Sequence, residues 1–126
     1  MAAFYHIDKD RKLVMSTVSG ALTRDDLESH MRKLRSDPDF DPRFSQLADF
    51  THMTKLEVTA DDIRYFARTS VFDSDSRRAF IVGDDVSALL AEMFALLRKV
   101  AGERGRCVFR TLEEGIEWIL PRVTVR

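Results

Sequence analysis

Histidines and their neighbouring carboxylates are the first side chains in this sequence whose types could support catalysis. His6, His30 and His52 lie far apart in the chain and share no spacing typical of metal ligands. His52 comes just after a predicted strand, near Asp49 and Glu57, where α/β proteins commonly place their sites. One hypothesis is therefore a small enzyme that transfers protons with His52 and Asp49 or Glu57. The competing interpretation is a solvated loop histidine.

An alternating run of aspartates could bind a metal ion. Asp37, Asp39 and Asp41 have the spacing of the first ligands in a calcium-binding loop. Such a loop needs a glycine at its sixth position and a glutamate at its twelfth, and Pro42 and Ala48 stand there instead. The pattern therefore predicts carboxylates that bond to local backbone amides, and we expect no metal site.

Nucleophiles and cofactor motifs are sparse. Cys107 is the single cysteine, so neither an intramolecular disulfide nor a thiolate zinc cluster can form, and we expect it to be a small core residue in a strand. The sequence has no nucleophile elbow, no phosphate-binding glycine loop and no dinucleotide fingerprint. We therefore expect no catalytic residues and no cofactor, and interpret the chain as a binding or regulatory protein and not an enzyme.

Composition limits the classes of partner and compartment. The 126 residues are 44% hydrophobic and 33% charged, which is typical of one globular domain spanning residues 1–126. A net charge of −1 argues against nucleic acid, because phosphate binding needs a basic excess. No leader is visible, and no apolar run approaches the roughly 20 residues that span a bilayer, so we expect a cytoplasmic protein.

The elements that position these residues alternate along the chain. Apolar periodicity and turn residues predict strands at residues 4–7, 12–19, 44–50, 79–82 and 106–110, with Gly20 ending the second. Thr23, Thr59 and Thr111 are predicted helix N-caps, and the second helix is expected to extend through residues 71–72. Residues 51–58 are expected to be a connection. The order β-β-α-β-α-β-α-β-α predicts an α/β fold with a mixed five-stranded sheet whose first edge strand is antiparallel.

The predicted helix at residues 86–101 has an unusually wide apolar face. We expect this width to be covered by a second copy of the chain or by an apolar ligand, because exposed apolar area commonly marks a partner. Met93 and Phe94, together with Phe66 and Phe72, would suit an adaptable apolar pocket. The residues expected to line an apolar ligand or an interface are Ile63, Phe66, Phe72, Leu89, Met93, Phe94 and Leu97.

Several segments together resemble one bacterial family. They are residues 18–23 (VSGALT), 37–42 (DPDFDP), 46–49 (QLAD), 77–79 (RRA) and 111–118 (TLEEGIEW). The chain resembles the SpoIIAA-like proteins, which are related to STAS domains and compared with SEC14-type lipid-binding domains. The resemblance covers nearly the whole chain, and it implies a small regulatory or carrier domain, often a homodimer, with a site for an apolar small molecule or a membrane lipid.

The resemblance also implies an alternative function. Anti-sigma-factor antagonists, the better-understood relatives, are protein interaction modules switched by phosphorylating a serine in an Asp-Ser-Ser-Gly element. The matching stretch at residues 57–60 reads EVTA, in which only Thr59 offers a hydroxyl. An N-cap threonine already uses its oxygen to accept from first-turn amides, so we expect that phosphorylation of Thr59 is not a switch.

Overall fold

A mixed five-stranded sheet forms the centre of the protein, as predicted. The computed structural model describes residues 3–73, 75–83 and 106–120, and the predicted helix at residues 86–101 lies outside them. The strand order is β1-β2-β3-β4-β5, with β1 antiparallel to β2 and every other pair parallel. The strands are β1 (Ala3–Asp8), β2 (Leu13–Thr23), β3 (Ser45–Glu57), β4 (Arg78–Ile81) and β5 (Arg106–Phe109). The helices are α1 (Arg24–Ser36), α2 (Ala60–Arg68) and α4 (Leu112–Ile119).

Each of these helices begins at a predicted threonine N-cap. The side chain of Thr23 accepts from the amide of Asp26, and that of Thr59 accepts from the amide of Asp62. Both aspartates return the bond to the cap residue's own amide, so each pair forms a capping box. The helix starts are therefore encoded locally, within four residues.

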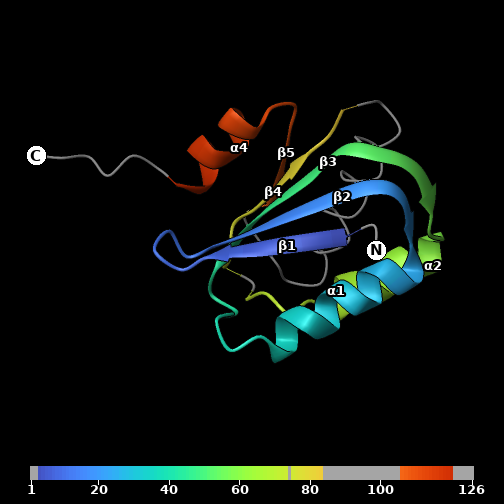
Figure 1. Ribbon diagram of the computed structural model, residues 1–126, viewed down its shortest axis with the longest axis horizontal. Helices are drawn as coiled ribbons and strands as arrows, with labels where there is room; N and C mark the ends of the chain where they lie inside the picture. Colours follow the sequence, from blue (N-terminus) through green and yellow to red (C-terminus); the bar gives the residue numbers. More distant parts are fainter. Residues whose placement is uncertain (1–2, 74, 84–105, 121–126) are drawn as a thin grey trace, which may run out of the picture.

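The helices cover opposite faces of the sheet (Figure 1). α4 packs on one face, where Ile119 joins a core of Leu13, Leu47, Ala79 and Ile81. Gly115 permits this close contact, because a Cβ there would lie 2.7 Å from Ile81 Cδ1. α1 and α2 lie on the other face.

Alternation along the strands decides which residues reach the α1 and α2 face. Val14 and Val18 of β2 pack in apolar clusters on that face. Leu13, the first residue of β2, points to the opposite face and packs under α4. In β4, Phe80 belongs to a cluster separate from that of Ala79 and Ile81. A side-chain period of two thus gives the sheet one face for α4 and another for the cavity described below.

Three predicted boundaries were wrong. β2 does not end at Gly20 but continues to Thr23, and β3 runs through residues 51–57, which were expected to be a connection. The two extensions pair with each other, and Gly20 has a φ of +78° near a register shift, so the irregular ladder hides the period of two. α2 ends at Arg68, so Val71 and Phe72 lie in the following loop and not in the helix.

Candidate functional site

A cavity of about 90 Å³ lies between the sheet and the two helices α1 and α2. Its wall is mostly apolar. The sheet contributes Val18, Ala48 and Phe80, α1 contributes Leu27 and Met31, and α2 contributes Ile63 and Phe66.

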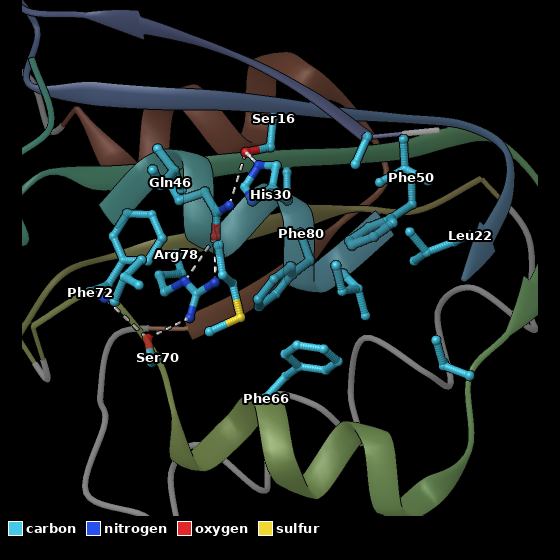
Figure 2. A pocket seen from close by; sticks show the side chains of 18 of the residues that line it. Ser16, Leu22, His30, Gln46, Phe50, Phe66, Ser70, Phe72, Arg78 and Phe80 are labelled. Atoms are coloured by element: carbon cyan, nitrogen blue, oxygen red, sulfur yellow. Dashed lines mark hydrogen bonds between the residues drawn. The ribbon is translucent and has the colours of Figure 1, made fainter. Parts of the chain in front are cut away.

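Polar side chains gather at one end of this cavity (Figure 2). Ser16 comes from β2, Gln46 from β3 and Arg78 from β4, so three adjacent strands each supply one residue. His30 reaches them from α1, and Ser70 from the loop after α2. The cavity is therefore amphiphilic, with an apolar body and one polar end.

The hydrogen bonds of this polar end have a fixed direction. A guanidinium can only donate, and Gln46 Oε1 accepts from both Nε (2.9 Å) and Nη2 (2.5 Å) of Arg78. The amide nitrogen of Gln46 must then face the other way, and it donates to Ser16 Oγ at 3.0 Å. Ser16 Oγ lies 2.9 Å from His30 Nε2. With Oγ already accepting from Gln46, the simplest arrangement has the Ser16 hydroxyl donating to His30.

Arg78 carries a positive charge into this interior. It is only 5% exposed, and its guanidinium carbon lies 4.5 Å from the ring centroid of Phe72 and 5.6 Å from that of Phe80. Cation–π contacts of this kind stabilise a desolvated guanidinium. Nη1 also donates to Ser70 Oγ at 3.4 Å. The cation thus lies at the cavity wall, held by aromatic faces and by polar side chains.

His30 is neutral near pH 7. Burial lowers its pKa from 6.5 to about 4, and the positive charges of Arg78 and Lys33 act in the same direction. The ring of Tyr5 packs edge-on against His30 at a centroid distance of 5.5 Å. A neutral imidazole accepting at Nε2 carries its proton on Nδ1, which agrees with the direction of the hydrogen-bond chain.

The predicted apolar site residues fall into two groups. Ile63, Phe66 and Phe72 line the cavity and are 3%, 1% and 7% exposed. The other four, which are Leu89, Met93, Phe94 and Leu97, lie outside the described residues.

Sequence reasoning missed the polar end. Ser16, Gln46 and Arg78 each occupy a buried position on the cavity side of a strand. A signal was present, because Ser16 lies between Val14 and Val18 at the spacing that shares one face. A polar residue at the inward parity of three neighbouring strands would have pointed to this cluster.

The carboxylates of the predicted proton-transfer group have partners other than His52. Asp49 accepts from the amide and hydroxyl of Thr51 at 2.9 and 2.7 Å, and Glu57 lies 3.5 Å from Lys55 Nζ. Within the described part of the chain, neither carboxylate is hydrogen-bonded to His52, which is exposed.

The aspartate loop bonds to its own backbone, as predicted. Asp37 Oδ1 accepts from the amide of Asp39, and Asp41 Oδ1 accepts from the amide of Arg43, each at 2.9 Å. These amide bonds, with the Arg43 side chain as the larger cause at Asp41, lower the pKa of both carboxyl groups. Among residues 3–73, 75–83 and 106–120, no three His, Cys, Asp or Glu side chains form a group that could hold a metal ion.

Among the helices of the described residues, none is long and apolar enough to cross a membrane.

Comparison with solved structures identifies the fold. The chain is similar to an uncharacterised protein from the DUF3478 family with a SpoIIAA-like fold, from Shewanella loihica PV-4. The TM-score is 0.62, the identity is 17%, and the match covers 94% of each chain. No protein-family model and no curated protein matches the sequence. The protein therefore has a SpoIIAA-like α/β fold, which confirms both the fold predicted from the order of the elements and the resemblance to SpoIIAA-like proteins.

Proposed function

We propose that this protein is a non-catalytic binding domain that takes an apolar or lipid-like small molecule into the cavity under α1 and α2. The observation that supports this function is the cavity itself. Protein interiors leave few voids larger than a water molecule, whose share of liquid volume is about 30 Å³. A cavity of about 90 Å³ with a mostly apolar wall is space that ordinary packing would have filled.

The size of the cavity defines how a ligand would enter. An apolar cavity of about 150 Å³ is enough to bind benzene, whereas whole drug-sized ligands occupy roughly 300–1,000 Å³. A longer chain would therefore need α2 to move outward. This helix is nine residues long, and Ile63 and Phe66 are its buried apolar contacts with the cavity.

Binding without catalysis is the better match to the polar end. Gln46 and Ser16 are already hydrogen-bonded within the chain that joins Arg78 to His30, so each serves to hold its neighbour. Asp49 and Glu57, the carboxylates of the enzymatic alternative, bond to Thr51 and Lys55. We infer that Gln46 and Ser16 orient a ligand and stabilise the sheet.

We also propose that the protein is a homodimer and that it is located in the cytoplasm. A homodimer is proposed from the wide apolar face of residues 86–101, which lie outside the described residues. The net charge of −1 supports a partner other than nucleic acid, and a single cysteine is compatible with the cytoplasm.

A cavity-filling variant tests the function. We expect 1-octanol to shift the methyl NMR signals of Ile63 and Leu22, which line the cavity, and Ala48→Met to weaken this binding roughly tenfold or more by occupying the space. Ala48 is buried on the cavity side of β3, and a flexible Met side chain would lie where the ligand lies. Thr54→Met, at an exposed position of the same strand, is the matched control and should bind as the wild type does. Equal binding by both variants would show that the ligand does not bind in the cavity.

A further inference from the structure

We infer that the ligand of this cavity carries an uncharged carbonyl oxygen on an apolar body, and that this oxygen accepts hydrogen bonds from the side chains of Gln46 and Ser70. The inference rests on the proposed function and specifies the chemical class of its ligand. It follows from an excess of hydrogen-bond donors over acceptors at the polar end of the cavity.

The side-chain amide of Gln46 has one N–H group more than its contacts use. Nε2 carries two N–H groups, and one of them donates to Ser16 Oγ at 3.0 Å. Oε1 accepts from Arg78, so the amide cannot be turned round. Gln46 is only 4% exposed and lines the cavity, and a buried donor without an acceptor is costly. Its second N–H is therefore left for a ligand.

The hydroxyl of Ser70 also retains a proton to donate. Its Oγ accepts from Arg78 Nη1 at 3.4 Å and from the amide of Phe72 at 3.1 Å. Both lone pairs are then in use, so the proton must be donated to a further acceptor. Ser70 lines the cavity from the loop after α2, at the same end as Gln46 (Figure 2).

The contact between Ser16 and His30 leaves a third donor, whichever tautomer is present. Neutral His30 has one N–H group, and its Nε2 lies 2.9 Å from Ser16 Oγ. If the Ser16 hydroxyl donates there, the Nδ1–H of His30 is left over, and if Nε2–H donates, the hydroxyl is. In the part of the chain that the structure describes, no acceptor is hydrogen-bonded to these remaining donors of Gln46, Ser70 and the Ser16–His30 pair.

A carbonyl oxygen has the chemistry that this excess of donors requires. It accepts two hydrogen bonds and brings no donor of its own, whereas a hydroxyl group brings a further proton. A carboxylate would also accept, but its charge costs far more to remove from water, and the N–H groups of Arg78 already donate to Gln46 and Ser70. The apolar body of the ligand would extend toward Leu22, at the opposite end of the cavity (Figure 2).

The test compares 2-octanone with 2-octanol on the wild-type chain, because the two differ only at the carbon that bears the oxygen. We expect 2-octanone to bind at least about fivefold more tightly, which is the factor that corresponds to one net hydrogen bond. NMR titration of the methyl signals of Ile63, which lines the cavity, gives both affinities.

Infrared spectroscopy gives a second readout, which reports on the carbonyl group directly. With 2-octanone labelled with ¹³C at the carbonyl carbon and the protein in excess, the stretching frequency should be lower than in an alkane solvent, because accepted hydrogen bonds weaken the C=O bond. Ser70→Ala removes one donor and should reduce both this shift and the preference for the ketone. Ser70→Thr keeps the hydroxyl group and is the matched control, which should retain both.

Each outcome bears on a different statement. Equal affinities for the ketone and the alcohol, or a bound carbonyl frequency equal to that in an alkane, would overturn the carbonyl inference and leave the apolar site standing. Water, and not the ligand, would then satisfy the donors. Failure of both compounds to bind would remove the proposed function itself. If Ser70→Ala does not fold, the affinities and the infrared frequency of the wild type decide the matter.

Discussion

Arg78 lies on a sheet face where its neighbours carry aromatic rings and aliphatic side chains. Burying a cation is costly unless its charge and its N–H groups are compensated. Here Gln46 compensates two N–H groups with one oxygen, and Phe72 and Phe80 contribute their ring faces. The residues around Arg78 thus keep a charge inside the protein, next to the space proposed for a ligand.

Gln46 links the guanidinium to the rest of the polar chain, which makes it the residue to vary. We expect Gln46→Leu to lower the free energy of unfolding by about 2–3 kcal/mol, because Arg78 loses two buried hydrogen bonds and Ser16 loses one. Gln46→Glu should be closer to wild type in stability, since a carboxylate can accept from Arg78. Urea denaturation measures both stabilities, and equal stability of the two variants would contradict the role given to Gln46.

The lowered pKa of His30 predicts how the free energy of unfolding depends on pH. Its pKa in the folded protein is about 4, below the ordinary 6.5, so the unfolded chain binds the extra proton over this range. The contribution of neutral His30 to the free energy of unfolding is therefore fully present above about pH 6.5. It is lost as the pH falls toward 4, by an amount on the order of 3 kcal/mol. Urea denaturation at a series of pH values measures this loss.

A non-titrating variant supplies the control for His30. His30→Gln keeps a side chain able to accept from Ser16 but has no proton to gain in this range. Its stability should vary less between pH 6.5 and 4 than that of the wild type. Asp8, Asp37, Asp41 and Asp62 have pKa values below their usual 3.8, so their contribution is lost at lower pH. The same slope in both proteins would show that another group titrates.

The apolar half of the site could be predicted at this scale, whereas the polar half could not. Ile63 and Phe66 were expected from residue type and helical spacing, because large apolar side chains on one helix face are buried. Phe72 was expected from its residue type, and it lines the cavity from the loop after α2 and not from the helix. Ser16, Gln46 and Arg78 are far apart in sequence and become neighbours only through strand pairing. Their inward direction depends on parity, which a single polar residue in a short strand does not reveal.

α2 contributes Ile63 and Phe66 to the wall of the cavity. It begins at the capping box of Thr59 and Asp62 and is joined to α1 by an Arg24–Asp62 ion pair of 2.9 Å. The guanidinium of Arg24 also lies 5.1 Å from the ring centroid of Tyr65. Local capping and the contacts of Arg24 with Asp62 and Tyr65 therefore help to hold this helix beside α1.

Substitutions at Thr59 test whether this residue stabilises the start of α2 and is not a phosphorylation switch. We expect Thr59→Ala to lower the free energy of unfolding by about 1 kcal/mol, the usual cost of losing an N-cap, and Thr59→Ser to change it little. Hydrogen exchange should be faster in α2 of the alanine variant. Ligand binding should persist in both variants, since Thr59 does not line the cavity. Stoichiometric phosphorylation of Thr59 in cells would instead support the protein-interaction alternative.

Element starts were predicted more accurately than strand ends. Thr23, Thr59 and Thr111 lie at the beginning of the helices they were expected to cap, because a cap depends on residues only three positions apart. The extensions of β2 and β3 depend instead on each other, through pairs such as Ser19 with His52. Pairing between distant segments cannot be inferred from the sequence of either segment alone.

At the scale of the whole molecule, the sheet has two differently used faces. α4 packs closely on one face through Gly115 and Ile119, whose surroundings leave no room for a Cβ at Gly115. The other face holds the cavity, with Arg78 at one end and apolar side chains along it. In this protein the sheet therefore has one closely packed face and one face that lines a cavity.

Native mass spectrometry of the intact chain, before and after incubation with a bacterial lipid extract, tests ligand binding most directly. We predict that the wild type gains the mass of one small amphiphile per chain and that Ala48→Met gains little, while the mass of the protein part shows whether two copies are associated. A chain that carries no small molecule, takes up none from the extract and behaves as the Ala48→Met variant does would contradict the proposed binding function.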